Sequence, residues 1–354
     1  MVYLHPQHPC IFPFLKTFTT GKPFPLELGA VLPDLTIGYH THGRLNEAKD
    51  NVIWICHALT ANSDPMEWWP GLVGPGKLFD PDHHFIVCAN MLGSCYGTTG
   101  PLSVNPGTGT AWYRDFPEIT IRDMAAAHEL LRHHLGISSI HTLIGGSIGA
   151  HQAMEWAISQ PHLVENLVLL ATNAVISPWA IAFNQSQRMA IEADPTFFGK
   201  SPDGGLTGLK AARSIALLSY RNLQTYNRTQ QETDINKTSG FKASSYQEYQ
   251  GEKLVKRYNA YSYHLIARAM DTHNVARHRE SIAKALGVIR SKTLAVGISS
   301  DILFPPHDLQ IIVQHIPGSH YAEITSDYGH DGFLIEDAQL TSIIQRFYLI
   351  LPPS

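Results

Sequence analysis

A serine between glycines, Gly145-Gly-Ser147-Ile-Gly149, is the group in this chain best placed for nucleophilic chemistry. It follows the short apolar run 141–144 and precedes a stretch with helical character at 150–159. Such a strand–turn–helix is sharp, and glycines are needed where a Cβ would meet the backbone or the following helix. The turn raises the serine hydroxyl above the sheet, beside the positive end of the helix. Since the pattern alone can be structural, Ser147 is a nucleophile only if the chain also supplies a base and an acid.

Two residues far along the chain complete a candidate triad with this serine. An activated serine needs a base within hydrogen-bond reach and a carboxylate that orients the base. In folds with this serine turn, the acid and then the histidine follow the serine along the chain. Asp301 and His330 each come just after a short apolar run, so we expect both at the carboxyl edge of the sheet. Asp301 could instead cap a helix that begins near Pro306. Asp327 is a rival acid, although its position three residues before His330 is more typical of a turn.

The oxyanion that forms during acyl transfer needs two backbone N–H donors. We expect one from Ile148, the residue after the serine. The other should come from the loop after an early strand. The run 52–59 ends such a strand at the same edge, which makes the Leu59 N–H the candidate. His57-Ala58 could instead be only a strand end, but the order of the elements favours the oxyanion site.

Short apolar runs, rich in β-branched residues and separated by helical patterns, predict a buried and mostly parallel sheet in an α/β protein. They occur at 51–59, 84–91, 141–145, 167–171, 293–298 and 321–325. One helix is clearly signalled, because Thr120 and Asp123 resemble a capping box and Gly136 ends the pattern.

The pattern changes between the fourth and fifth of these runs. The segment there is polar and rich in tyrosine, with helical stretches at 206–218 and 253–270 and loops at 200–205 and 229–240. We predict a core domain of residues 1–174 and 287–354, and a helical cap of residues 175–286 over the carboxyl edge of the sheet.

Composition excludes several classes of protein. The 354 residues are 44% apolar and 16% charged with a formal net charge of −4, and no run of Lys and Arg suggests a nucleic-acid partner. No apolar stretch approaches the roughly 18 residues of a membrane span. The cysteines have neither metal-ligand nor disulfide-framework spacing, which favours a reducing compartment such as the cytoplasm. They are Cys10, Cys56, Cys88 and Cys95. His40 and His42 would share one strand face, but without a third ligand we expect no metal site.

Several segments resemble the homoserine O-acetyltransferases of methionine biosynthesis, which have an α/β-hydrolase fold. Upstream they are 56–61, 74–77, 89–101, 115–123 and 145–152, and downstream 181–188, 301–306 and 328–331. The resemblance covers essentially the whole chain. Asn90 to Pro101 and the Gly329-His-Asp331 sequence are its most specific parts, because they are not general features of hydrolases.

The resemblance implies roles for particular residues. Ser147 would be the nucleophile, Asp301 the orienting acid and His330 the base. Homoserine's carboxylate would bind Arg213 and its ammonium Asp331, which suits a fork-shaped guanidinium and a carboxylate.

Two further residues of the predicted cap match positions near the family's site. Tyr220 matches a tyrosine beside the substrate. Arg188 is a second candidate for contact with a carboxylate or a phosphate of coenzyme A.

The implied reaction moves an acetyl group from acetyl-CoA to the γ-hydroxyl of L-homoserine through an acyl-serine. Acetyl-CoA is then a co-substrate, no other cofactor is expected, and the family implies a homodimer. The chain departs from the family at Ser147-Ile-Gly-Ala-His-Gln152, where the family reads Ser-Met-Gly-Gly-Met-Gln, and at Leu217-Leu-Ser-Tyr220.

Both departures are close to the predicted acyl pocket, so succinyl transfer to homoserine or serine stays open. No Lys or Arg follows the nucleophile before Arg188, and His151 is expected neutral and one turn below the serine turn, which favours an acetyl donor. An ester hydrolase with the same triad and a silent binding protein with a ligand under the cap also stay open.

Overall fold

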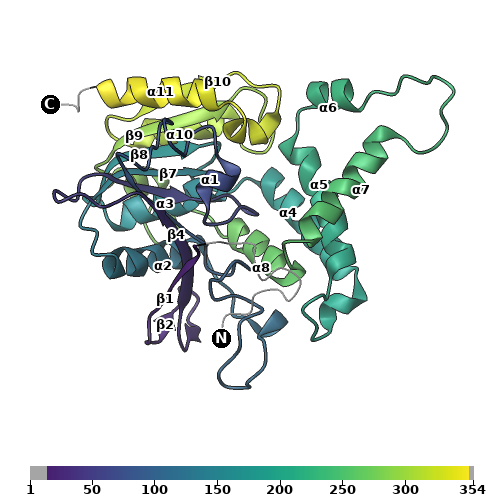
Figure 1. Cartoon of the computed structure of the whole chain (residues 1–354), viewed down its shortest axis with the longest axis horizontal. Helices are drawn as coiled ribbons and strands as arrows, with labels where there is room; N and C mark the ends of the chain where they lie inside the picture. Colours follow the sequence, from purple (N-terminus) through teal and green to yellow (C-terminus); the bar gives the residue numbers. More distant parts are fainter. Residues whose placement is uncertain (1–13, 351–354) are drawn as a thin grey trace.

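An eight-stranded sheet lies in the core of the structure (Figure 1). The structure is a computed structural model, and it describes residues 14–350. From edge to edge its strands are β1 (Lys16–Thr19), β4 (Thr36–His42), β6 (Phe85–Ala89), β5 (Val52–Cys56), β7 (Ile140–Gly146), β8 (Val164–Leu170), β9 (Lys292–Ile298) and β10 (His320–Ile324). Strands β5 to β10 run parallel, and β1 and β4 are antiparallel at one edge. Each predicted apolar run overlaps one of the parallel strands, so the predicted sheet is confirmed. A two-stranded ribbon of β2 (Phe24–Pro25) and β3 (Val31–Leu32) lies outside it.

Helices cover both faces of this sheet. In the core they are α1 (Pro65–Trp68), α2 (Ile121–His134), α3 (Ile148–Ser159), α10 (Pro306–His315) and α11 (Asp337–Leu349), with the 3₁₀ turns η1 (Tyr113–Asp115) and η3 (Gly329–Leu334). Consecutive residues of a strand lie on opposite faces of the sheet. Trp54 belongs to the hydrophobic cluster with α2 and α3, whereas Ile53 belongs to the cluster with α11. Because both faces are buried, the strands read as continuous apolar runs.

Local sequence signals fix the ends of α2. The Thr120 side chain accepts from the Asp123 N–H at 3.4 Å, and the Asp123 carboxylate accepts from the Thr120 N–H at 2.8 Å. This capping box is the predicted one, and Gly136, with φ of 67°, follows the end of the helix. The second Asp123 oxygen accepts from the Glu27 N–H at 2.7 Å, so the same cap also holds the N-terminal segment against the core.

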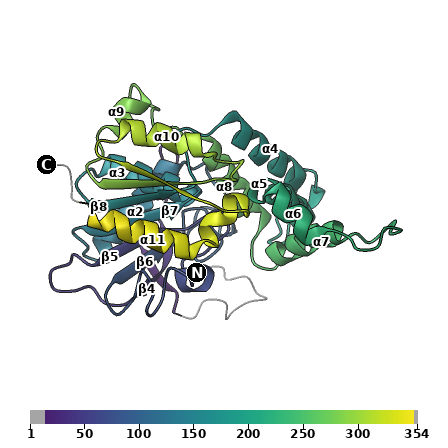
Figure 2. The same cartoon turned by 90° about the horizontal axis from the view of Figure 1, so that it is seen from above.

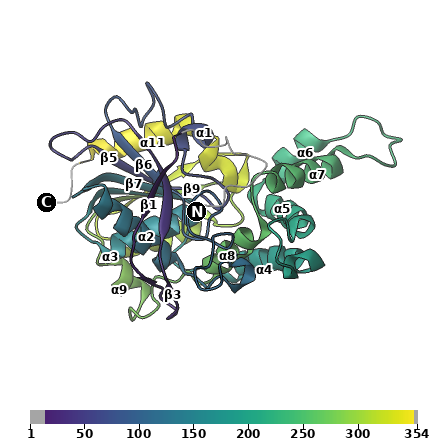
Figure 3. The same ribbon diagram turned by 60° about the horizontal axis from the view of Figure 1, so that its bottom comes forward.

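Between β8 and β9 the chain leaves the sheet and forms a series of helices. They are α4 (Pro178–Glu192), the turn η2 (Pro195–Phe198), α5 (Leu206–Tyr220), α6 (Leu223–Gln230), α7 (Lys242–Val255), α8 (Ala260–Asp271) and α9 (Ile282–Leu286). The two limbs of this excursion meet at an antiparallel bridge between Val175 and Asn274. We call residues 176–273 the lid. Figure 3 shows α4 to α7 projecting from one side of the core.

The lid differs in two details from the expected cap of 175–286. The predicted helix 253–270 is broken, because α7 ends at Val255 and Asn259 starts α8 by accepting from the Ser262 N–H at 2.8 Å. The last helix of the expected cap, α9, packs against α10 of the core and lies away from the lid helices (Figure 2). Within residues 14–350, no helix is long and apolar enough to cross a membrane.

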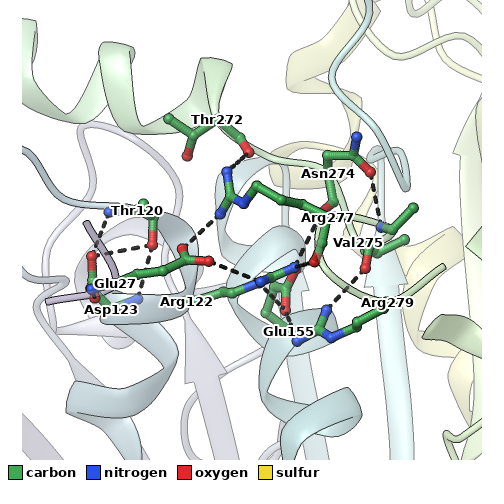
Figure 4. A network of polar contacts seen from close by, with 11 residues as sticks. Glu27, Thr120, Arg122, Asp123, Glu155, Thr272, Asn274, Val275, Arg277 and Arg279 are labelled. Atoms are coloured by element: carbon green, nitrogen blue, oxygen red, sulfur yellow. Dashed lines mark hydrogen bonds and ion pairs between the residues drawn. The ribbon is translucent and has the colours of Figure 1, made fainter. Parts of the chain in front are cut away.

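A network of ion pairs ties the returning limb of the excursion to the core (Figure 4). Glu155 on α3 contacts Arg279 at 2.7 Å and Arg122 at 3.3 Å. Glu27 contacts Arg122 at 2.9 Å and Arg277 at 2.7 Å, and Arg122 also donates to the Arg277 carbonyl at 2.6 Å. The Glu155 side chain is only 2% exposed, so its charge depends on these arginines. The network therefore fixes the base of the lid to α2 and α3.

We expect Glu155→Gln to destabilise the fold. The variant keeps the shape of the side chain but leaves Arg279 without its carboxylate partner and Arg122 with that of Glu27 alone, a change of the kind that costs about 3 kcal/mol. Thermal unfolding should show a midpoint lowered by about 3–6 °C. Glu118→Gln is the matched control, since its pair with Arg268 is half exposed and contributes little. Equal midpoints for the two variants would contradict the assigned role of the network.

Candidate active site

Ser147 lies at the tip of a strained turn between β7 and α3. Its backbone has φ of 57° and ψ of −129°, a conformation that residues other than glycine rarely adopt and that is found at functional sites. The neighbours must be glycine: a Cβ on Gly149 would lie 2.1 Å from the Cys56 carbonyl oxygen, and one on Gly145 would lie 2.4 Å from the Gly149 backbone. The turn is held to the next strand because the Ser147 N–H donates to the Leu170 carbonyl at 3.0 Å.

His330 and Asp301 form a buried hydrogen-bonded pair at the same edge of the sheet. The Nδ1 of His330 lies 2.7 Å from Oδ2 of Asp301. The other carboxylate oxygen of Asp301 accepts from the N–H groups of Leu303 and Phe304 at 2.8 and 3.0 Å. Asp301 thus holds the His330 ring and also closes a tight turn. It does not cap α10, whose first flanking residue is Pro305.

The rival acid, Asp327, has a different environment. Its side chain is largely exposed and lies 3.5 Å from Arg228 of the lid. The carboxylate that contacts His330 is the buried one of Asp301, and Asp327 pairs with Arg228 instead.

Opposing effects set the pKa of His330. Burial lowers it, whereas the charge and hydrogen bond of Asp301, together with the charge of Asp331, raise it. The balance is a pKa above the usual value of the group. Aromatic rings surround the imidazole, with centroid distances of 5.7 Å to Tyr220, 5.3 Å to Phe304 and 5.7 Å to Phe333. A base that is screened from water and oriented by a carboxylate is suited to proton transfer at neutral pH.

The two expected oxyanion donors are on adjoining elements. Ile148 is the first residue of α3, so its N–H has no partner within the helix. Leu59 is buried in the loop after β5, and the Gly149 contact with Cys56 brings that strand end against the start of α3. The arrangement can present both N–H groups beside Ser147.

His151, one turn beyond the serine, is buried and uncharged. Its Nε2 lies 3.0 Å from the side-chain oxygen of Asn173, and its ring stacks on His273 at 3.9 Å. Burial lowers its pKa to about 3. His151 therefore adds no positive charge near Ser147.

Three predicted substrate-binding residues come together at the end of α5. The Arg213 guanidinium lies 5.7 Å from the centre of the Tyr220 ring, which in turn lies beside His330. Among residues 14–350 no carboxylate forms an ion pair with Arg213, and the charges of Arg213 and Asp331 both act on Tyr220. Asp331 follows His330 directly in η3 and pairs with Arg221 at 2.8 Å. No pattern in the sequence signals the role of Arg221, because the pairing depends on how the lid docks.

The fourth predicted substrate contact, Arg188, has a partner within the protein. Its guanidinium lies 2.6 Å from Asp271 and donates to the side chain of Gln185 at 2.6 Å. A largely buried guanidinium is stable only with a carboxylate close by, and Asp271 of α8 supplies it. This geometry favours a structural role in joining α4 to α8, in place of the expected contact with substrate or coenzyme A.

The remaining candidates for metal or redox chemistry have ordinary environments. His40 lies 2.8 Å from the Ser63 hydroxyl and His42 pairs with Asp64 at 3.3 Å. Over residues 14–350 no three His, Cys, Asp or Glu side chains are grouped to hold a metal ion. Cys56 and Cys88 are buried free thiols, and Cys95 is a half-buried one; Cys10 lies outside the described residues.

Comparisons with known proteins show the family to which the chain belongs. The family profile described as alpha/beta hydrolase fold matches residues 51–337. The homoserine O-acetyltransferase of Cyclobacterium marinum is 48% identical, over 94% of this chain and 95% of the relative. That of Chlorobaculum parvum is 43% identical, over 96% of each chain. The chain belongs to the homoserine O-acetyltransferase family.

Solved structures of the same fold include both transferases and esterases. The homoserine O-acetyltransferase of Bacillus anthracis superposes with a TM-score of 0.88 at 26% identity, covering 97% of this chain and 100% of the other. Esterase E22 gives a TM-score of 0.85 at 25% identity, covering 94% of this chain and 99% of the other. The fold alone therefore does not separate transferases of this family from ester hydrolases.

The pKa of His330 leads to a testable pH dependence. The base must be neutral to accept the serine proton, so the acylation rate should rise with pH through a midpoint above about 6.5, the ordinary histidine value. Asp331→Asn removes one of the charges that raise the pKa of His330, so the midpoint of the pH–rate profile should move to lower pH. The measurement is the rate of p-nitrophenol release from p-nitrophenyl acetate between pH 5 and 9.

Asp327→Asn is the matched control, because Asp327 pairs with Arg228 and does not act on the pKa of His330. Its midpoint should equal that of the unsubstituted protein. An upward movement in Asp331→Asn would contradict the assigned cause.

Proposed function

We propose that this chain transfers an acetyl group from acetyl-CoA to the γ-hydroxyl of L-homoserine, with Ser147 as the covalent carrier. The observation that supports this most is the pair of opposite charges beside the base. The Arg213 guanidinium is without an acidic partner in the described residues, and the Asp331 carboxylate, which pairs with Arg221 through Oδ2, adjoins His330. A zwitterionic amino acid can place its carboxylate on the first and its ammonium on the second, which points its hydroxyl toward the histidine.

The first half-reaction forms the acyl-enzyme. His330 accepts the proton of Ser147, whose oxygen attacks the thioester carbon of acetyl-CoA. The N–H groups of Leu59 and Ile148 stabilise the oxyanion of the tetrahedral intermediate. The carbon–sulfur bond then breaks, and the thiolate of coenzyme A leaves with the proton from His330.

The second half-reaction moves the acetyl group to the acceptor. His330 takes the proton of homoserine's γ-hydroxyl, and the oxygen attacks the acetyl-serine carbonyl. The same two N–H groups hold the oxyanion. The ester is released when the Ser147 oxygen leaves and recovers its proton from His330. No metal or redox step is needed, and acetyl-CoA enters as a co-substrate.

Acetyl-CoA is the proposed donor in preference to succinyl-CoA. A succinyl group ends in a carboxylate, so a pocket for it should offer a cation near Ser147. His151 is neutral, and Arg188 is paired with Asp271.

The competing proposal is an ester hydrolase that uses the same triad, and the likeness to esterase E22 gives it weight. The two differ in whether an amino-acid hydroxyl or water takes the acyl group. A hydrolase of neutral esters has no need of a guanidinium and a carboxylate beside the base.

From the family resemblance we also propose that the protein acts as a homodimer in the cytoplasm. Sedimentation of the purified protein tests the first part, and fractionation of cells tests the second.

Arg213→Ala tests the proposed acceptor site. Loss of a charge-assisted contact to the substrate carboxylate should raise the KM for L-homoserine by about 30- to 100-fold. The KM for acetyl-CoA should change less than about threefold, because the guanidinium is assigned to the acceptor alone. The control is Arg228→Ala, another lid arginine, whose partner Asp327 is exposed. Equal increases in both KM values would count against the zwitterion site.

A competition between donors and acceptors tests the reaction itself. Purified protein with L-homoserine and both acetyl-CoA and succinyl-CoA should form O-acetylhomoserine as the main product. Replacing homoserine by L-serine should lower kcat/KM, and with no amino acid the release of free thiol should be slow. Faster succinyl transfer would reassign the donor, and thiol release that is independent of homoserine would favour the hydrolase.

A further inference from the structure

The loop that carries the proposed oxyanion donor Leu59 is held from the lid. The hydroxyl of Tyr258, which lies between α7 and α8, donates to the Leu59 carbonyl at 3.2 Å. The preceding residue, Arg257, donates to the Thr60 carbonyl and approaches the Thr60 hydroxyl at 3.4 Å. The break between α7 and α8, which the sequence did not predict, is therefore the part of the lid that contacts this loop.

The segment Asn90–Pro101, specific to the family but without a role in the proposed chemical steps, supports these two residues. The Tyr96 hydroxyl accepts from the Arg257 guanidinium at 2.7 Å, and the Tyr96 ring packs edge-on against Tyr258 at 5.5 Å. The Cys95 thiol donates to the Arg257 carbonyl at 3.7 Å. Tyr258 is thus fixed by its own backbone neighbour and by a core loop, and its buried hydroxyl is directed at one carbonyl.

The peptide group that contains the Leu59 N–H is held from the core side. Its carbonyl, on Ala58, accepts from the Ala61 N–H at 3.0 Å and lies 2.8 Å from Nδ1 of His57. The Met91 N–H donates to Nε2 of His57 at 3.2 Å, so the proton of the neutral ring is on Nδ1 and points at Ala58. Burial lowers the pKa of His57 to about 4, which keeps the ring neutral.

The Leu59 N–H therefore lies between two anchored carbonyls. The core fixes the one before it, on Ala58, and the lid fixes the one after it, on Leu59. Oxyanion donors are effective because they are already aimed before the charge develops. Rotation of the Ala58–Leu59 peptide would turn the N–H away from the oxyanion, and a shift of the Leu59 carbonyl would displace the residue that carries the N–H.

We propose that Tyr258, supported by Arg257, is a positioning residue for the oxyanion site, so that docking of the α7–α8 junction sets the direction of the Leu59 N–H. This rests on the proposed acyl-transfer function. Tyr258 touches neither substrate nor the reacting atoms; it acts through the Leu59 peptide. The lid then contributes to the rate of acylation as well as to recognition of the acceptor.

Tyr258→Phe is the direct test, since it removes one hydroxyl and keeps the ring contacts. The rate constant for thiol release after rapid mixing with acetyl-CoA should fall about tenfold, as expected for the loss of one positioning hydrogen bond at an oxyanion site. The acetyl-CoA concentration at half-maximal rate and the pH midpoint should not change. Affinity for a trifluoromethyl ketone, which forms an oxyanion on Ser147, should fall by a similar factor.

Tyr261→Phe is the matched control. Tyr261 is on the same stretch of the lid, and its hydroxyl also donates to backbone carbonyls, those of Gly199 and Ser201, but within the lid. Its acylation rate should stay within about twofold of the unsubstituted protein, because these contacts do not reach the Leu59 peptide.

Two results would overturn the proposal: an unchanged acylation rate in Tyr258→Phe, or equal losses in the two variants. Failure of the proposed function would give a different result, because the unsubstituted protein itself would then transfer no acetyl group to homoserine.

Discussion

The crowded turn at Ser147 is the constraint on which the rest of the site depends. A positive φ at a residue with a side chain is unfavourable, and it persists here because strands on both sides hold the turn. The approach of Gly149 to the Cys56 carbonyl leaves no room for a side chain, and it draws the end of β5 against the start of α3. One contact thereby raises the serine oxygen and brings the loop of Leu59 beside the N-terminus of the helix. The positions of the proposed nucleophile and of the proposed oxyanion donors are consequences of the same backbone geometry.

The lid makes specific contacts with two loops of the core, the one that carries His330 and the one that carries Leu59. The end of α5 contacts the histidine loop: a Cβ on Gly329 would lie 2.8 Å from the Tyr220 carbonyl, and Arg221 pairs with Asp331. The α7–α8 junction contacts the oxyanion loop through Tyr258. At its base the ion pairs of Glu27 and Glu155 attach the returning limb to α2 and α3. A buried base with few water contacts and a fixed oxyanion loop both require that the lid stay docked.

Local sequence signals predicted the elements, and distant contacts explain what they missed. The apolar runs and the Thr120–Asp123 capping box depend on neighbours within a few residues, so the strands and α2 could be predicted from the sequence. The order Ser147, Asp301, His330 could be proposed from the sequence because the turn at Ser147 restricts the fold. The pairing of Arg188 with Asp271 joins residues far apart in sequence, and nothing local distinguished this arginine from Arg213. The α7–α8 break was missed because the apolar spacing continues across it, while Asn259 caps a new helix.

The central claim is that Ser147 carries the acyl group between two substrates, and intact-mass measurement tests it most directly. Protein mixed with acetyl-CoA and no acceptor should gain one acetyl group, and peptide mapping should place it on Ser147. Adding L-homoserine should remove the group within the time of one catalytic turnover, much faster than buffer alone, with O-acetylhomoserine formed in equal amount. An unmodified Ser147 during active turnover, or an acetyl group that homoserine does not discharge faster than water, would contradict the account.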